Sequence, residues 1–193
     1  MPATKIFLDT EFTGLRQNTT LISLALVAET GEEFYAEFTD YDQEQLKQLL
    51  SDEETKPFFA SLMSKCWNDL PEKVSKKLNG PYICSDKNKI AAAIKDWLGQ
   101  FKLVEVWADV LAYDWVLFCD LFGGARHIPE NIFFAPFDLA TLFRLRSMIE
   151  PEGKYKKDIS RYDFAGVDIK KQHHALEDAR VELLSFKKLM NNE

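Results

Sequence analysis

The chain has 193 residues, of which 46% are hydrophobic and 28% charged, and its formal net charge is −7. This composition supplies a folded core and excludes intrinsically disordered and low-complexity chains. The acidic balance disfavours broad coating of a polyanion, although a site that brings divalent cations changes its own local charge. We expect one cytoplasmic domain over residues 1–193 with no membrane association, because no apolar run approaches roughly 18 residues and the amino terminus has no leader pattern.

The first half of the chain predicts a meander of strands followed by a helical segment. Residues 5–9, 21–28 and 32–38 have the apolar, β-prone character of strands, and Glu29-Thr30-Gly31 is typical of a hairpin turn. Residues 43–78 then carry apolar side chains at spacings of three and four, which predicts helices. This segment contains no motif with evident chemistry, and we interpret it as a helical insert.

The second half alternates strands and helices. Ser85 is the expected cap of a helix over residues 88–101, and a buried strand follows at 103–108. A helix is expected to begin near residue 112, and a short extended segment to follow at 132–134. Two more helices are expected, over residues 137–148 and 174–190. Hairpin strands followed by this alternation predict an α/β fold, with a mixed β-sheet that opens on an antiparallel meander and is flanked by helices.

Asp9 and Glu11 are the first candidate functional residues. Residues two apart on a strand point to the same face, so their carboxylates can lie side by side. Two adjacent anions favour a hard divalent cation between them, and Gly14 allows the chain to turn close to a ligand. A strand end with solvated acids is the alternative.

A second pair of acids follows the buried strand at 103–108. In α/β sheets, ligands bind beyond the carboxyl ends of the strands, where Asp109 and Asp114 fall. Asp114 is the stronger candidate, because it lies between Tyr113 and Trp115, where an unpaired charge would be costly. Asp109 can instead cap the following helix.

Two histidines and an acid open the final helix. His173 lies five residues before Asp178, so both side chains can face one cavity, and a histidine of near-neutral pKa suits general-base catalysis. His174 can fill that role as well, since four residues is also a same-face distance on a helix. A surface histidine pair beside solvated acids is the third interpretation.

Three motifs occur together in a known order. They are Phe-Leu-Asp-Thr-Glu-Phe-Thr-Gly-Leu at 7–15, Ala-Tyr-Asp at 112–114 and His-x4-Asp at 173–178. With them the chain resembles the DEDDh 3′-to-5′ exonucleases of the ribonuclease H-like superfamily. Over most of its length it is similar to a small bacterial and phage branch of 3′-to-5′ exoribonucleases. The five-residue interval of the third motif favours His173 over His174.

The resemblance implies a ribonuclease H-like fold and two divalent cations, Mg²⁺ or Mn²⁺. It implies that Asp9, Glu11, Asp114 and Asp178 hold these cations and that His173 takes the proton of the attacking water. It also implies that Thr13 and Leu15 seat the terminal nucleotide. One departure is Val110, where many members of the group have an asparagine, so a substrate contact made there does not carry over.

The substrate predicted by the resemblance is the 3′ end of RNA. Residues 154–162 carry four basic side chains among aromatic ones, so Lys156 and Lys157 are expected to hold phosphates, and Tyr155 or Tyr162 to stack on bases. A solvated loop of mixed charge is the alternative for this segment. A homodimer is expected from the family alone.

Two other functions fit the same motifs. One is 3′-to-5′ cleavage of single-stranded DNA, since no residue here can be assigned a contact to the 2′-OH. The other is a nucleic-acid-binding module that keeps the fold without catalysis. The complete set of four carboxylates and a histidine argues against that module, because a binder has no reason to concentrate anions where a phosphate must lie.

Overall fold

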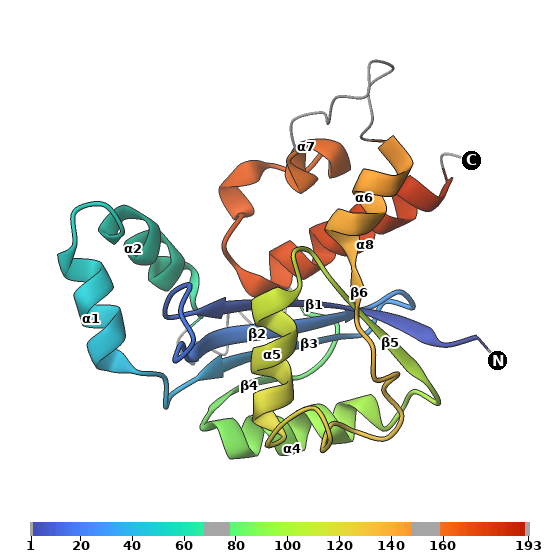
Figure 1. The fold of residues 1–193 in the computed structure, drawn as a ribbon, viewed down its shortest axis with the longest axis horizontal. Coiled ribbons are helices and arrows are strands. Elements are labelled where there is room, and N and C mark those ends of the chain that lie inside the picture. The colour runs from blue at the N-terminus through green and yellow to red at the C-terminus, as the bar shows by residue number, and fades with distance from the viewer. Residues whose placement is uncertain (1, 68–77, 148–158, 192–193) are drawn as a thin grey trace.

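A six-stranded sheet crosses the protein in the order β4-β3-β2-β1-β5-β6 (Figure 1). The structure is a computed structural model that describes residues 2–67, 78–147 and 159–191. The strands are β1 (Thr4–Phe12), β2 (Leu21–Ala28), β3 (Glu33–Phe38), β4 (Tyr82–Ser85), β5 (Val104–Ala108) and β6 (Phe137–Asp138).

The strands pair both antiparallel and parallel. β1, β2 and β3 form an antiparallel meander, whereas β4 pairs with β3, and β5 with β1 and β6, in parallel. The turn between β2 and β3 is closed by hydrogen bonds between Ala28 and residues 31 and 32, and Gly31 there has a φ of 109°, a conformation that favours glycine. The predicted α/β fold with a mixed sheet and an opening meander is confirmed.

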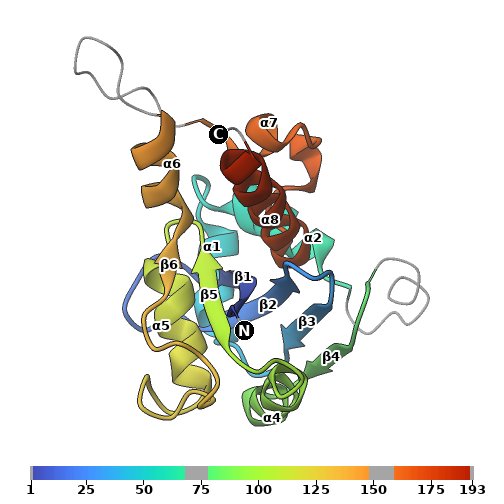
Figure 2. The same ribbon diagram turned by 90° about the vertical axis from the view of Figure 1, so that its right-hand side faces the viewer.

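Helices cover both faces of the sheet. α8 packs on β1 and β2 with α6 and α7 beside it, and α4 and α5 cover the opposite face (Figures 1 and 2). α1 and α2 pack against each other beside the sheet, near the end of β1 (Figure 1). The helices are α1 (Gln43–Ser51), α2 (Lys56–Lys65), α4 (Lys87–Leu98), α5 (Ala112–Leu121), α6 (Leu139–Ser147), α7 (Arg161–Ala165) and α8 (Ala175–Asn191), with a short 3₁₀ turn at Ile169–Lys171.

The core lies on both sides of the sheet because the central strands are buried on both faces. In β1, Ile6 and Leu8 pack with α4 and α5, whereas Phe7 packs with α8. A smaller cluster joins Ile22 to the apolar faces of α1 and α2. Within the described residues, no helix combines the length and the apolar character that a membrane span requires.

The structure differs from the sequence prediction at short elements and caps. β4 and β6 are edge strands of four and two residues, too short to leave a period in the sequence. Ser85 is the last residue of β4 and not a helix cap. Asp86 caps α4, and its carboxylate accepts hydrogen bonds from the backbone N–H groups of Asn88 and Lys89. In the insert, α1 and α2 are helical as expected, and residues 68–77 lie outside the described chain.

Candidate active site

Asp9 and Glu11 point from β1 toward α8. They pair with Ala25 and Ser23 of β2, and Phe7, two residues earlier on the same strand face, packs in the core beneath α8. Both acids line a cavity of about 470 Å³ between the end of β1 and the start of α8. The register of β1 thus brings the two carboxylates to one place, as the sequence predicts.

Asp114 enters this cavity from the first turn of α5. Its side chain is buried, and Oδ1 accepts hydrogen bonds from the Thr10 backbone N–H at 3.0 Å and from Thr10 Oγ1 at 2.6 Å. Thr10 lies between the two acids of β1, so these bonds fix α5 against the strand that carries them. The structure therefore places Asp114 with Asp9 and Glu11.

Asp178 completes the cluster from the first turn of α8. Its Oδ2 accepts from the backbone N–H groups of His173 at 2.7 Å and His174 at 3.1 Å. Its Oδ1 accepts from the Tyr162 hydroxyl at 2.6 Å. The carboxylate thus binds the loop that precedes its own helix, as an acid in a helix's first turn does when it satisfies free N–H groups.

His173 faces the cavity because its backbone has an uncommon conformation. Its φ is 65°, in the left-handed region that few non-glycine residues adopt. Its ring packs edge-on against Phe58 of α2, with 4.7 Å between ring centroids, and Lys65 of α2 donates to the carbonyl of Gln172. Ligand atoms of Glu11, His173 and Asp178 lie within 4.8 Å of one another.

His174 lies elsewhere. It is buried, stacks on Tyr35 at 4.9 Å and packs against Trp67 at 5.4 Å. Its side chain is not among those that line the cavity. Of the two histidines that the sequence offers as a base, the structure brings His173 to the acids and leaves His174 in the aromatic packing.

Burial and mutual repulsion raise the pKa values of the clustered acids. Burial is the main cause of the raised pKa of Asp9, followed by the charges of Asp178, Glu11 and Asp114. Burial, with the charges of Asp178 and Asp114, raises the pKa of Glu11 to about 8. Burial also raises the pKa values of Asp114 and Asp178 to about 6, against the lowering effect of the hydrogen bonds that each accepts.

These residues fit a divalent cation. Asp9 Oδ2 is buried and, within the part of the chain that the structure describes, has no hydrogen-bond partner, although a buried carboxylate oxygen is costly without one. The cluster offers mainly carboxylate oxygens, which are the ligands that hard cations such as Mg²⁺ and Mn²⁺ select. A cation would satisfy the free oxygen and offset the repulsion that raises these pKa values.

Glu182 is a site residue that sequence reasoning missed. It lines the same cavity, is buried, and lies four residues after Asp178 on α8. The signal was present, because residues four apart share a helix face. Its Oε1 accepts from the backbone N–H of Asp109 at 3.0 Å. Asp109 does not cap α5 but forms an ion pair with Arg161 at 2.9 Å.

Other expected substrate contacts are located differently. Tyr162 is buried and bonded to Asp178, so it is not a platform for stacking bases. Thr13 is fully buried, and its hydroxyl donates to Gln45 Oε1 at 2.6 Å, so its side chain does not line the cavity. Leu15 is 78% exposed. Val110 is exposed with a φ of 57° and does not line the cavity.

The predicted basic segment is only partly described. Lys156 and Lys157, together with Tyr155, lie outside the described residues. The described end of this segment includes Arg161, which is buried and whose guanidinium contacts Asp109 and the ring of Phe143. Arg161 therefore supports the fold beside the cavity.

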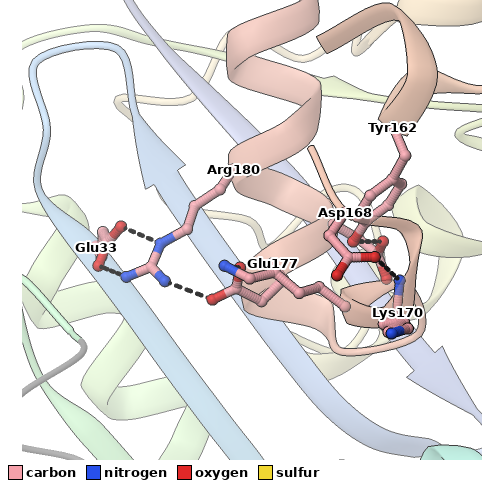
Figure 3. A network of polar contacts seen from close by, with 8 residues as sticks. Glu33, Tyr162, Asp168, Lys170, Glu177 and Arg180 are labelled. Carbon is pink, nitrogen blue, oxygen red and sulfur yellow. Dashed lines mark hydrogen bonds and ion pairs between the residues drawn. The ribbon is translucent and has the colours of Figure 1, made fainter. Parts of the chain in front are cut away.

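An arginine fixes the start of α8 on the sheet. Arg180 donates to both carboxylate oxygens of Glu33 on β3, at 2.6 and 2.7 Å, and to Glu177 at 2.8 Å (Figure 3). Bidentate pairs of this kind constrain geometry more than single hydrogen bonds do. Because Asp178 follows Glu177 directly, this pairing helps to set the position of its carboxylate.

Comparison with known families decides where this chain belongs. Residues 4–190 match the model of the 3'-5' exoribonuclease Rv2179c-like domain. The chain is a member of the Rv2179c-like family. No curated protein matches it.

Solved structures show the same fold as this Rv2179c-like chain. The metal-free form of the E. coli exonuclease I complex with single-stranded DNA matches with a TM-score of 0.59 at 13% identity. That match covers 100% of this chain and 40% of exonuclease I. Exonuclease I in complex with the inhibitor BCBP matches with a TM-score of 0.54 at 12% identity, over 100% of this chain and 42% of that one. The chain therefore spans less than half the length of these structures. The similarity over the whole of this chain confirms the predicted ribonuclease H-like fold.

Proposed function

We propose that this protein is a divalent-cation-dependent 3′-to-5′ exonuclease that removes nucleotides from RNA ends. The observation that carries the proposal is the convergence of acids from β1, α5 and α8 with His173 in one cavity. Membership of an exoribonuclease-like family supports the reaction class and favours RNA over DNA.

Each residue of the cluster has a role in this proposal. Asp9, Glu11 and Asp178 would hold one cation, and Asp9 together with Asp114 would hold a second. When bound, such cations neutralise phosphate charge and lower the pKa of a water molecule. The protein's own contribution is the fixed carboxylate geometry, which the register of β1 and the bonds of Asp114 and Asp178 maintain.

His173 would accept the proton of the attacking water. Burial is the main cause of the lowered pKa of His173, and the Lys65 charge adds to it, so the ring is neutral at pH 7 and can take a proton. The water oxygen forms the new bond to phosphorus, and the 3′ oxygen of the preceding nucleotide leaves. The products are a nucleoside 5′-monophosphate and an RNA one nucleotide shorter.

Single-stranded DNA is the second candidate substrate. The exonuclease I structure that this fold matches is a complex with single-stranded DNA. A role in binding nucleic acid without turnover is the remaining alternative. The homodimer and the cytoplasmic location stay predictions, and light scattering on the purified protein tests the former.

A time course on labelled oligonucleotides tests the proposal. RNA and DNA of one sequence, labelled at the 5′ or the 3′ end, are incubated with Mg²⁺, Mn²⁺ or EDTA. We expect 5′-labelled RNA to shorten one nucleotide at a time and 3′-labelled RNA to release labelled mononucleotide at once, in either metal but not in EDTA.

Matched variants assign the activity to the cavity. Asp9→Asn should abolish the ladder, and His173→Ala should slow it about 10²-fold to 10⁴-fold. Asp96→Asn and His127→Ala change exposed residues of the same types outside the cavity and should leave it intact. Equal rates on DNA would move the assignment to the second candidate. Binding of RNA without turnover in any metal would contradict the nuclease.

A further inference from the structure

Glu182 is a buried carboxylate with one free oxygen. It is 4% exposed and lies one helical turn after Asp178 on α8. Its Oε1 accepts from the Asp109 backbone N–H at 3.0 Å, but its Oε2 is buried and finds no hydrogen-bond partner among the described residues. A buried, ionised oxygen that nothing satisfies is among the costlier features a fold can carry.

The second free oxygen of this cavity belongs to Asp9. Asp9 Oδ2 is likewise buried without a partner, and Glu182 lines the cavity that Asp9 lines. The charge of Glu182 is one of the causes of the raised pKa of Asp9, so the two carboxylates are near enough to repel each other. One free oxygen from β1 and one from α8 thus face the same cavity.

Two basic side chains of the described residues, Arg161 and Lys65, bond to other groups near the cavity. Arg161 contacts Asp109 and the carbonyl of Ile159. Lys65 donates to the carbonyl of Gln172, on the side of the cavity where His173 lies. Among the residues that the structure describes, no hydrogen-bond donor reaches Glu182 Oε2.

We propose that Glu182 is a fifth carboxylate of the cation site, with Oε2 directed at a divalent cation on the Asp9 side of the cluster. The contact is direct or passes through one metal-bound water. This inference rests on the proposed function for the presence of cations, but it adds a residue that the four-carboxylate motif does not contain.

Charge balance favours the same arrangement. The charge of Lys65 lowers the pKa values of Glu11 and Asp178, so this lysine is part of the local field. Counted over the described residues with every acid ionised, five carboxylates and one lysine leave four negative charges, which two divalent cations neutralise. Asp109 and Arg161 form a pair and do not change this balance.

Glu182→Gln separates cation binding from a purely structural role. Glutamine keeps the shape and the carbonyl oxygen that accepts from Asp109, but it removes the charge. Glu37→Gln is the matched control, because Glu37 is also buried, accepts hydrogen bonds at both carboxylate oxygens and lies outside the cavity. Calorimetric titration with Mn²⁺ alone, and melting temperatures with and without Mn²⁺, measure binding without turnover.

We expect wild type to bind two Mn²⁺ ions. In Glu182→Gln, the affinity of the weaker ion should fall about tenfold to a hundredfold, the range found when groups around a metal are removed. The metal-free variant should melt at or above the wild-type temperature, because a neutral amide of the same shape replaces a buried carboxylate, and the rise on adding Mn²⁺ should shrink. Glu37→Gln should melt at a lower temperature, because it disturbs a carboxylate bonded to two tyrosine hydroxyls, and should titrate as wild type does.

Identical Mn²⁺ titrations for wild type and Glu182→Gln would overturn the role of Glu182 while leaving the cation site intact. Absence of Mn²⁺ binding to wild type would overturn both this inference and the proposed function. Anomalous diffraction from wild-type crystals soaked in MnCl₂ gives a reading independent of any variant's folding. We expect a peak within about 2.5 Å of Glu182 Oε2, or one water molecule away, and a peak only beside Glu11 and Asp178 would contradict the proposal.

Discussion

Asp9 and Glu11 are held by a strand, whereas His173 is held by contacts from other elements. The strand side of the cavity is fixed by the pairing of β1 with β2, so its two carboxylates follow from register alone. The loop side, residues 172–174, depends on Asp178, Phe58 and Lys65. Two of the proposed cation ligands are therefore built into the sheet, and the proposed base is positioned by contacts from helices α2 and α8.

This comparison explains a role for the helical insert. α2 supplies both Phe58, which contacts the His173 ring, and Lys65, which contacts the Gln172 carbonyl. A segment without a motif of its own thus contacts the loop of residues 172–174, which carries the proposed base. Changes on α2 should affect the base and leave the cation ligands in place.

The largest effect is expected where the two sides meet. Asp178 is a candidate cation ligand, and it also accepts from the His173 backbone, so Asp178→Asn should impair both sides at once. Turnover should fall on the order of 10⁴-fold, the scale seen when a member of a catalytic unit is removed. Single-turnover cleavage of RNA measures this loss. Asp163→Asn, which changes an exposed acid on α7, is the control. A loss of less than tenfold in Asp178→Asn would show that Asp178 is not part of the active site.

Removing the base alone should affect only the loop side. His173→Ala should lower turnover about 10²-fold to 10⁴-fold, as loss of a general base does, while Mn²⁺ binds nearly as in wild type. Because burial and Lys65 lower the pKa of His173, wild-type activity should rise with pH through a midpoint below 6.5.

The pH profile of the variant decides the assignment. In His173→Ala the rise with pH should disappear, whereas His127→Ala should keep it. A wild-type rate that stays flat from pH 5.5 to 8.5 at saturating metal would exclude a histidine base.

The cluster of buried acids should make the metal-free protein less stable as pH rises. Glu11 has a pKa of about 8, and Asp114 and Asp178 have pKa values of about 6, all above those of an unfolded chain, near 4. The folded state thus binds more protons than the unfolded chain does. The contribution of this cluster to the free energy of unfolding therefore decreases as pH rises from about 4 to 8. Melting temperatures in EDTA should decrease over this range by several degrees.

Divalent metal should reverse that trend. Saturating Mn²⁺ neutralises the deprotonated acids and should raise the melting temperature most at pH 8. Asp9→Asn should lessen both the pH dependence and the effect of metal. A metal-free stability that increases from pH 5 to 8 would show that other groups dominate.

The smallest effect is expected on α2. Lys65→Met should raise the pKa of His173, because the lysine charge lowers it, and should therefore move the midpoint of the activity profile to higher pH. Turnover at pH 8 should fall about tenfold or less, since one half-exposed charge contributes about 1 kcal/mol. Lys95→Met, on α4, is the matched control, and an unchanged midpoint in Lys65→Met would show that α2 does not act on the base.

The sequence predicted what local patterns encode. Apolar runs located the central strands, and the order of Asp9, Glu11, Asp114 and Asp178 indicated acids that meet in space, as the structure finds. Strand and helix periods decide which side chains share a face, so they placed Asp9 with Glu11 and allowed either histidine to face Asp178. The choice of His173 came from the third motif of the family that the chain resembles.

The sequence did not predict contacts made between distant elements. The bond from Tyr162 to Asp178 and the packing of Phe58 on His173 depend on how helices dock, which no local period specifies. β6 is only two residues long, and its partner determines it. The spacing of Glu182 from Asp178 predicts that both lie on one face of α8. That Glu182 Oε2 has no hydrogen-bond partner among the described residues depends on the tertiary structure of the cavity, which spacing does not encode.

One titration tests the central claim that the buried acids hold the cations on which turnover depends. Metal-free wild type is titrated with Mn²⁺ while RNA cleavage and melting temperature are followed on the same samples. We predict that both rise over one range of Mn²⁺ concentration, and that in Asp9→Asn cleavage does not respond and the melting temperature responds less. Full cleavage in EDTA, or a melting temperature indifferent to Mn²⁺ while cleavage proceeds, would contradict the account.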